Sequence, residues 1–329
     1  MNHLIFQALA DAARRGEPLA LGIITGVRGS SPQKLGAKAI FHADGRIQGT
    51  LGGGCLEAEA QRLALRSLKT RQPETFDLVL DHDFGWDDGL ICGGRVSGVI
   101  LPNAQGIGPT FWAELAERKN PQTWGVKNDF SVARTDSHFP TLPLSHSPDP
   151  DWLYTETISP PCALWIAGCG HLAQAVAPLA LQLDFAVTIF DDRPELANHE
   201  NFPGAASIQV GNWGQLCATP LPKVPTFGLI VTRGHQHDAL VLETWIHRPF
   251  EFLGMIGSAR KARTISEQFI KKNIATQEEM ARVACPVGIK IRSQSVMEIA
   301  VDILAQYIDK RAELVNEKQV APTGKFELA

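Results

Sequence analysis

The sequence predicts an α/β protein of two domains, with a doubly wound parallel sheet in the C-terminal domain and a separate mixed sheet in the N-terminal domain. The strongest observation is the order strand, glycine turn, helix, strand and acidic pair over residues 164–192. Further apolar strands alternate with helix-length segments as far as residue 256, as a parallel sheet requires. A hairpin signal at Asp44 and Gly45 indicates antiparallel pairing in the N-terminal half. We therefore expect a Rossmann-like C-terminal domain and an N-terminal α/β domain.

In the N-terminal domain, helical periodicity predicts helices at residues 4–15, 55–68 and 111–119. The strands predicted there are 19–25, 37–41, 45–51, 75–80 and 96–101, with two weak strands near Trp124 and Phe130. Nine of the 21 prolines of the chain fall between residues 102 and 161. We therefore expect this domain to cover residues 1–158 and to end in an irregular, proline-rich connector at about 102–158.

The C-terminal domain is expected over residues 159–312, with a polar tail at 313–329. Its predicted strands are 163–167, 186–190, 207–210, 228–231 and 252–256. Ligands of open parallel sheets bind beyond the carboxyl ends of the strands. Four loops of glycine, small polar and charged residues begin at such ends, at 168–171, 191–193, 232–238 and 257–261. We expect these loops to face one crevice.

The crevice has the pattern of a dinucleotide site. Gly168 would permit the tight turn, Gly170 would let the backbone approach a pyrophosphate, and Ala173 stands where a third glycine is often found. An acid after the second strand suits the two hydroxyls of a ribose. The candidate binding residues of this crevice are Gly168, Gly170, Ala173, Asp191, Asp192, His235, Gly257 and Ser258.

These residues also have simpler interpretations. Glycine turns can serve only to pack a helix against a sheet, and the two aspartates can cap a turn. His235 and His237 are either solvated or bind a metal, which would need further ligands that the sequence does not identify. Pro178 falls inside the first predicted helix and should kink it.

A second candidate site is the strand-to-helix junction that contains Gly52, Gly53, Gly54, Cys55 and Glu57. Consecutive glycines predict a backbone shape forbidden to other residues, and their N–H groups can form an anion cradle at the helix start. The helix dipole favours the thiolate form of Cys55, the form that bonds metals and sulfur electrophiles, whereas Glu57 opposes that effect. Alternatively, the glycines form a tight turn and the cysteine is a small buried residue.

Two further segments of the N-terminal domain carry polar or soft groups. Cys92 and Gly93 form another thiol–glycine pair, which would supply a second soft ligand if it faced the same cavity as Cys55. A polar turn at 29–32, with Lys34 and Lys38 after it, either binds phosphate or is an ordinary turn.

Composition limits the classes of function. The 329 residues carry a formal net charge of −4, with 44% hydrophobic and 20% charged residues, as in soluble globular proteins. This charge gives no electrostatic reason to expect nucleic acid or an acidic membrane as partner. No signal peptide or membrane-spanning apolar run is visible, so we expect a cytoplasmic protein. Six dispersed cysteines without a Cys-x-x-Cys pair argue against a zinc ribbon.

Together, these motifs resemble the xanthine dehydrogenase accessory protein family of the XdhC/CoxI type. The matching segments are 29–32, 52–57, 92–94, 168–171, 191–195, 232–235, 254–258, 285–288 and 298–300. The chain departs from the family at 289–297, where Arg292 replaces a glycine. The order and spacing of the motifs make the resemblance specific over residues 1 to about 310.

The resemblance implies a maturation factor and not an enzyme. Such a factor binds molybdenum cofactor (molybdopterin), supports its sulfuration and inserts it into a xanthine dehydrogenase-like molybdenum hydroxylase. The implied partners are that hydroxylase, a NifS-like cysteine desulfurase and a second copy of the chain in a homodimer. Cys55 would then contact molybdenum or sulfur.

Two other functions stay open. An NAD-dependent oxidoreductase would use the C-terminal crevice, with a residue such as His235 as acid or base. A nucleotide-sensing scaffold would bind NAD or another nucleotide without turnover.

Overall fold

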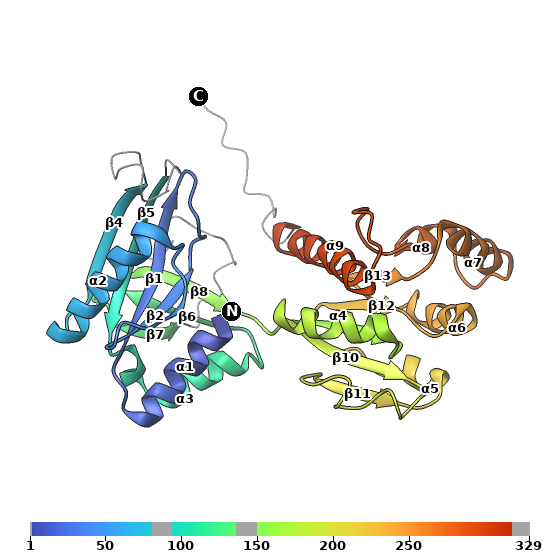
Figure 1. Ribbon diagram of the computed structural model, residues 1–329, viewed down its shortest axis with the longest axis horizontal. Helices are drawn as coiled ribbons and strands as arrows, with labels where there is room; N and C mark the ends of the chain where they lie inside the picture. The colour runs from blue at the N-terminus through green and yellow to red at the C-terminus, as the bar shows by residue number, and fades with distance from the viewer. Residues whose placement is uncertain (1, 81–93, 136–149, 318–329) are drawn as a thin grey trace. The chain divides into compact units, whose positions relative to one another are not determined.

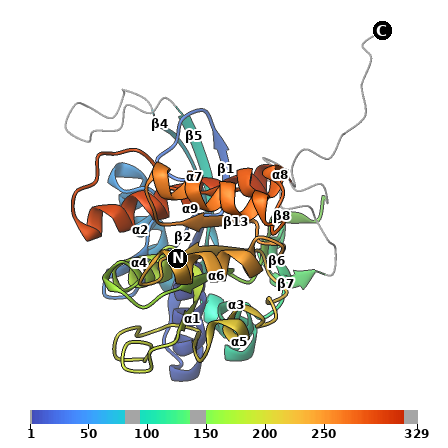
Figure 2. The same ribbon diagram turned by 90° about the vertical axis from the view of Figure 1, so that its right-hand side faces the viewer.

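The structure is a computed structural model that describes residues 2–80, 94–135 and 150–317. The chain forms two compact units, Met1–Pro160 and Pro161–Ala329, which are considered separately below (Figures 1 and 2). Within the described segments, no helix combines the length and the apolar character needed to cross a membrane.

The N-terminal unit is built on a five-stranded sheet of order β3-β2-β1-β5-β4. Its strands are β1 (Leu19–Arg28), β2 (Lys38–His42), β3 (Ile47–Gly49), β4 (Glu74–Leu80) and β5 (Gly94–Pro102). Every neighbouring pair is antiparallel, so the expectation of a mixed sheet is wrong. The hairpin between β2 and β3 turns at Gly45, as the sequence predicted, with φ of 88° at that residue.

Helices cover both faces of this sheet. Because the side chains of β1 point alternately to the two faces, this strand contributes to two separate cores. Leu19, Leu21 and Ile23 share a core with helices α1 (Asn2–Arg15) and α3 (Pro109–Glu117). Ala20 and Ile24 face the opposite way and pack with Leu56, Ala60, Leu63 and Ala64 of helix α2 (Gly54–Thr70). The apolar stripe of α2 thereby holds its first turn, with Cys55, at the end of β3.

The stretch expected to be an irregular connector carries a second sheet. After a short 3-10 helix (Ala104–Ile107) and α3, the strands β6 (Gln122–Lys127), β7 (Val132–Thr135) and β8 (Trp152–Ile158) form an antiparallel sheet of order β7-β6-β8. Trp124 and Tyr154 are buried in the same core as α1. Phe130, placed in a weak strand by the sequence, lies in the turn before β7 with φ of 65°. Residues 136–149 of the predicted connector lie outside the described residues.

The C-terminal unit has the predicted Rossmann-like architecture. Six parallel strands have the order β11-β10-β9-β12-β13-β14, which reverses direction beside the first strand of the unit. They are β9 (Cys162–Ala167), β10 (Phe185–Asp191), β11 (Ser207–Val210), β12 (Thr226–Ile230), β13 (Phe252–Met255) and β14 (Val283–Ala284). The two-residue strand β14 was not predicted, because so short a run has no periodicity to detect.

Both faces of the parallel sheet are covered by helices, visible in Figure 1. Helices α4 (His171–Gln182) and α9 (Val296–Glu317) share one core with the sheet. Helices α5 (Trp213–Cys217), α6 (His235–Trp245) and α7 (Ala259–Lys271) share the other, and α8 (Gln277–Ala281) precedes β14. Helix α4 runs through Pro178. Helix α9 continues into the predicted polar tail as far as Glu317, and residues 318–329 lie outside the described residues.

Candidate functional site

The triple-glycine junction is an open, left-handed bend between β3 and α2. Gly52, Gly53 and Gly54 have φ values of 127°, 75° and 57°, a region that side chains rarely adopt. A Cβ placed on Gly53 would meet no atom within 4 Å, whereas one on Gly52 would lie 3.0 Å from the Cβ of Pro32. The bend is therefore packed on one side and leaves space in front of Gly53.

Glu57 folds back onto this bend from the first turn of α2. Its Oε2 accepts hydrogen bonds from the Gly53 N–H at 2.9 Å and from the Thr50 hydroxyl at 2.8 Å. The Thr50 Oγ1 in turn accepts from the Gly52 N–H at 3.0 Å. Two of the amides expected in an anion cradle are thus already satisfied within the chain. The cradle that remains consists of the first N–H groups of α2, which have no acceptor within a regular helix.

Cys55 lies in that first turn as a half-buried free thiol, next to the exposed Gly54. The arrangement matches the predicted juxtaposition of amide donors and a soft sulfur at a helix start. The residue is half-buried and does not belong to the buried core of the unit.

The polar turn at 29–32 lies against two of the glycine segments. Pro32 contacts Gly52, and a Cβ on Gly94 would lie 1.9 Å from the carbonyl oxygen of Ser30. Only glycine therefore fits at position 94. Cys92 and Gly93, which precede it, lie outside the described residues.

Lys38 does not belong to a phosphate site. Its side chain is fully buried, and its Nζ donates to Glu156 Oε2 at 2.5 Å and to the Gly36 carbonyl at 2.8 Å. The rings of Phe6, Trp124 and Tyr154 surround it at 5.5–5.8 Å. Lys38 thus joins the two sheets of the N-terminal unit, whereas Lys34 is exposed. For Lys38, the interpretation as a phosphate ligand is wrong.

In the C-terminal unit, Gly168 and Gly170 differ in backbone conformation and in the space around them. Gly168 has φ of 119°, and a Cβ there would lie 2.3 Å from the carbonyl oxygen of Val231. Gly170 has an ordinary φ of −70° as N-cap of α4, and a Cβ on it would meet no atom within 4 Å. Gly168 is therefore required by packing, while Gly170 leaves open space at the start of α4. Ala173 is buried one turn further along α4.

Asp191, one of the two acids expected at the ribose position, is engaged within the chain. The Arg193 guanidinium forms two 2.8 Å hydrogen bonds to its carboxylate, one to each oxygen. The N–H of Cys169 donates to Oδ2 at 2.8 Å and the N–H of Arg193 to Oδ1 at 3.0 Å. The side chain is 1% exposed. We call this arrangement the Asp191–Arg193 clamp; because its donors already occupy both carboxylate oxygens, the acid is not free to bind a ribose diol.

The clamp also sets the protonation of its members. Burial by itself would raise the pKa of Asp191, but the hydrogen bonds and charge of Arg193 outweigh it and lower that pKa. Burial, followed by the charge of Asp191, raises the pKa of Cys169 to about 12. The thiol in the glycine turn is therefore neutral and buried, unlike the thiol of a metal ligand.

We expect the clamp to make the C-terminal unit sensitive to acid. Because the pKa of Asp191 is lowered in the folded state, its stabilising effect is present above the pKa of the unfolded chain. That stabilisation is lost as the pH falls through the lower, folded pKa. Asp191→Asn should lose about 2 kcal/mol of unfolding free energy at neutral pH and should show less dependence on acid pH. Urea unfolding between about pH 7 and pH 3 measures both effects, and equal acid dependence of the two proteins would contradict the prediction.

The other predicted crevice residues lie at the ends of neighbouring strands. Asp192 pairs with Arg233, whose Nη2 lies 2.8 Å from its Oδ2. His235 is exposed at the start of α6, and the His237 ring lies 6.2 Å from that of Trp213. Ser258 caps α7 by accepting a hydrogen bond from the N–H of Lys261, and Gly257 precedes it. No group of three or more His, Cys, Asp and Glu side chains within 2–80, 94–135 and 150–317 is arranged to hold a metal ion.

The sequence did not single out a buried polar cluster at the same edge of the sheet. Asp238, 2% exposed, accepts hydrogen bonds from the Thr232 hydroxyl at 2.6 Å and from the Lys261 Nζ. A Cβ on Gly257 would lie 3.1 Å from the Sγ of Cys285 and 2.9 Å from the Cδ of Lys261. Burial raises the pKa of the Cys285 thiol, the charge of Lys261 lowers it, and that of Asp238 raises it. Asp238 and Lys261 lie in the first turns of α6 and α7. The sequence placed their segments at one crevice but did not indicate this ion pair or the position of Cys285 beside it.

Comparison with family models agrees with this geometry. Residues 164–307 match the XdhC Rossmann domain, and residues 12–79 match the XdhC and CoxI family. Together the two matches cover more than half of the chain. The chain belongs to the XdhC and CoxI family.

Named relatives of this family member come from two bacteria. It is 26% identical to the uncharacterized protein YqeB of Escherichia coli K12, over 97% of this chain and 47% of that protein, so it spans about half the length of that relative. It is 25% identical to a probable xanthine dehydrogenase subunit of Bacillus subtilis, over 93% of this chain and 97% of that one. It is 24% identical to the molybdenum cofactor insertion chaperone PaoD of E. coli K12, over 98% and 93%.

A solved structure has the same fold. The crystal structure described as a xanthine dehydrogenase from Bacillus halodurans superimposes with a TM-score of 0.77, covering 94% of this chain and 96% of that one. The two sequences are 22% identical, so this likeness bears on the fold alone.

Proposed function

We propose that this chain is an accessory protein that binds molybdenum cofactor and delivers it to a xanthine dehydrogenase-like molybdenum hydroxylase. The observation that carries the proposal is the position of the half-buried Cys55 in the first turn of α2, two residues after the open space at Gly53. Membership of the XdhC and CoxI family supports it, as does the name of the relative PaoD.

The bend fits the chemistry of this cofactor, a phosphorylated pterin with soft sulfur ligands. The space that a Cβ at Gly53 would fill admits a ligand, and the first amides of α2 are suited to its phosphate. The thiol of Cys55 is suited to its molybdenum or sulfur. When bound, the cofactor supplies the metal centre that the acceptor enzyme needs; this chain holds and orients it.

Glu57 would position the bend for this ligand. Its carboxylate holds the Gly53 amide and, through Thr50, the Gly52 amide. The first N–H groups of α2 are then the backbone donors left for a ligand. The same negative charge repels an incoming phosphate, which weakens its binding and favours its release. Such balance suits a carrier that must pass its cargo on.

We further propose that a NifS-like cysteine desulfurase acts on the cofactor while this chain holds it. The partial exposure of Cys55 and the open space at Gly53 support this, because sulfuration requires the cofactor to remain reachable during binding. The sulfur would be delivered by the desulfurase, and this chain would supply no catalytic group.

The alternative function, an NAD-dependent oxidoreductase, has less support. The strand order and the open space at Gly170 favour a phosphate-bearing ligand in the crevice. However, the Asp191–Arg193 clamp engages one of the two acids expected at the ribose position, and the other, Asp192, pairs with Arg233. The exposed His235 takes part in none of the hydrogen bonds or ion pairs resolved for the described residues, so nothing orients it as an acid or base.

Cys55→Ala is expected to reduce retention of the cofactor without unfolding the protein. Loss of the sulfur contact should weaken binding by at least about tenfold, while removal of a half-buried thiol costs little stability. The measurement is molybdenum content and pterin fluorescence of protein purified from a molybdenum-replete host, with activation of an acceptor hydroxylase as a second readout.

Cys285→Ala is the matched control, since it removes a half-buried thiol from the other unit. It should retain the cofactor. If wild-type protein binds neither supplied cofactor nor molybdenum, the proposed function fails. If Cys55→Ala binds and delivers as well as wild type, the role of the thiol fails while the function stands.

A further inference from the structure

Exposed apolar side chains gather around helix α9 of the C-terminal unit. Of the twelve large apolar side chains that are exposed within the described residues, six lie between residues 289 and 308. Three of the six, Met297, Val301 and Ile308, stand on α9 itself and are between 38% and 53% exposed. Large apolar side chains that are concentrated in this way on the surface of a protein mark an interaction site.

The exposed apolar residues of α9 form one continuous stripe. Met297, Val301, Ala305, Ile308 and Ala312 follow one another at intervals of three or four residues, so they lie on the same face of the helix. The two alanines are half-buried and exposed, respectively. We call these five residues the α9 stripe. At 1.5 Å per residue the stripe is about 22 Å long.

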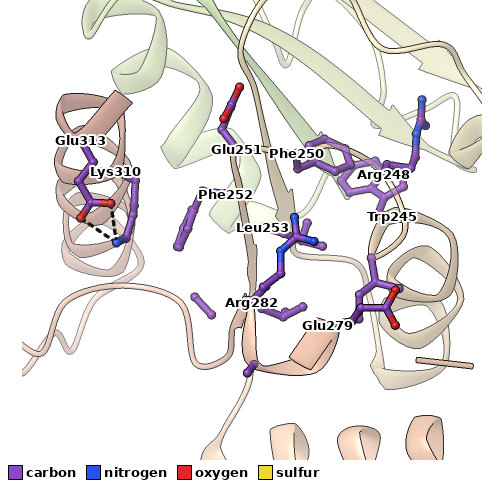
Figure 3. Close-up of a pocket in the computed structure, with 14 residues that line it drawn as sticks. Trp245, Arg248, Phe250, Glu251, Phe252, Leu253, Glu279, Arg282, Lys310 and Glu313 are labelled. Carbon is purple, nitrogen blue, oxygen red and sulfur yellow. Dashed lines mark hydrogen bonds and ion pairs between the residues drawn. The ribbon is translucent and has the colours of Figure 1, made fainter. Parts of the chain in front are cut away.

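The α9 stripe is separate from the face by which α9 packs on its own sheet. Ala300, Ile303 and Tyr307 form that second face, and they are fully buried in the core shared with α4. Another side of the helix is polar, and Figure 3 shows the ion pair of Lys310 with Glu313 there, with Nζ–Oε distances of 2.8 and 2.9 Å. Helix α9 therefore has two apolar faces, of which one is buried and one is exposed.

The α9 stripe is complementary in size to a second copy of itself. When two such helices pack antiparallel about a two-fold axis near Ala305, Met297 of one copy faces Ala312 of the other. In the same arrangement Val301 faces Ile308. The larger side chain at one end thus meets the smaller one at the other end, and the alanines at the axis let the helices approach closely. A two-fold contact requires such self-complementarity, because the same surface serves both partners.

The charges beside the stripe favour the same antiparallel arrangement. The loop before α9 lies against the first turns of the helix, where the Ser293 hydroxyl donates to the Asp302 carboxylate at 2.5 Å. Lys290 and Arg292 of this loop are exposed, as is Asp309 two turns further along α9. None of these three takes part in an ion pair resolved for the described residues. In the antiparallel pair the first turns of one helix face the later turns of the other, so these cations come near the carboxylate of the second copy.

We propose that two copies of this chain associate through the α9 stripe as a two-fold pair of antiparallel helices. Burial of the apolar side chains supplies the driving force, and the flanking charges fix the orientation. A pair of single helices buries less area than a permanent dimer interface, so the dimer should be reversible, with a dissociation constant of about 10 µM. The pairing does not depend on the cofactor site proposed at Cys55.

Analytical ultracentrifugation of the full chain tests the pairing. The wild-type protein should pass from monomer to dimer between about 1 and 100 µM. Ile308→Glu places a charge in the apolar contact and should weaken the dimer by about tenfold or more. The matched control is Ile270→Glu, because Ile270 of α7 is an isoleucine of the same unit with nearly the same exposure, 40% against 38%.

Cysteine cross-linking tests the two-fold arrangement with a change that leaves the stripe uncharged. Ala305 lies near the proposed axis, so in Ala305→Cys the new sulfurs of two copies should come within reach of a disulfide, and mild oxidation should link them. Ala262→Cys is the matched control, since Ala262 is a half-buried alanine of helix α7.

Three results would each overturn the proposal. They are a wild-type protein that stays monomeric up to about 100 µM, an Ile308→Glu variant that dimerises as well as Ile270→Glu, and an Ala305→Cys variant that cross-links no faster than Ala262→Cys. Any of them leaves the proposed cofactor function untouched, since that function is measured by molybdenum and pterin content.

Discussion

Gly168→Ala is expected to destabilise the C-terminal unit by about 3 kcal/mol or more. At φ of 119° an alanine is strained whatever the space around it. In addition, its Cβ would lie 2.3 Å from the carbonyl oxygen of Val231 and 3.0 Å from the Cα of Thr232. Both of these are backbone atoms, so relief requires the loops after β9 and β12 to separate. Urea unfolding monitored by tryptophan fluorescence measures the loss.

Gly170→Ala, two residues away, is the matched control. Its φ of −70° suits alanine, and the added Cβ would meet no atom within 4 Å. Its stability should stay within about 0.5 kcal/mol of wild type. If a phosphate approaches the start of α4, Gly170→Ala should nevertheless weaken its binding. Equal stability of the two variants would show that the loops after β9 and β12 do not need their close contact.

Lys261→Met is expected to cost about 3 kcal/mol of unfolding free energy. It would leave the carboxylate of Asp238, which is 2% exposed, buried without its cation. The hydrogen bond from Lys261 to the Ile256 carbonyl, at 2.9 Å, would also be lost. The same change removes the charge that lowers the pKa of Cys285, so that pKa should rise further. Thermal unfolding and the rate of thiol alkylation measure the two effects.

A double-mutant cycle separates the ion pair from simple loss of packing. Asp238→Asn in the Lys261→Met background removes the stranded charge, so the double variant should be more stable than the sum of the single losses predicts. Arg260→Met controls for removal of a cation, since Arg260 is the exposed neighbour on α7. Additive losses would mean that the two side chains do not interact.

The fold was predictable where local chemistry alone specifies it. The glycine turn at Gly168 and the apolar runs on either side of it predicted β9, α4 and β10, because a buried parallel strand is apolar throughout. Strand β8 (Trp152–Ile158) was not predicted, because it lies between prolines at 148, 150, 160 and 161 that indicated an irregular connector. The order of strands in the N-terminal sheet depends on contacts between distant segments, such as β1 with β5, which no local pattern encodes.

The candidate site was predictable in its backbone and not in its side-chain pairing. Positive φ at Gly52, Gly53 and Gly54 follows from the residue type. The partners of Asp191 and Lys38 do not follow in this way. Arg193 is two residues from Asp191, but that spacing does not decide whether the acid binds a ribose or its own neighbour. Lys38 pairs with Glu156, 118 residues away, through the packing of two sheets.

The Asp191–Arg193 clamp bears on how activities are assigned to genomes. A rule that scores glycine spacing and a strand-terminal acid would place this unit among the hydride-transfer enzymes. Here Arg193, two positions after Asp191, forms hydrogen bonds with both oxygens of that acid, so Asp191 stabilises the turn that contains it. The glycine spacing and the strand-terminal acid of this unit are therefore not sufficient by themselves to assign hydride transfer to it.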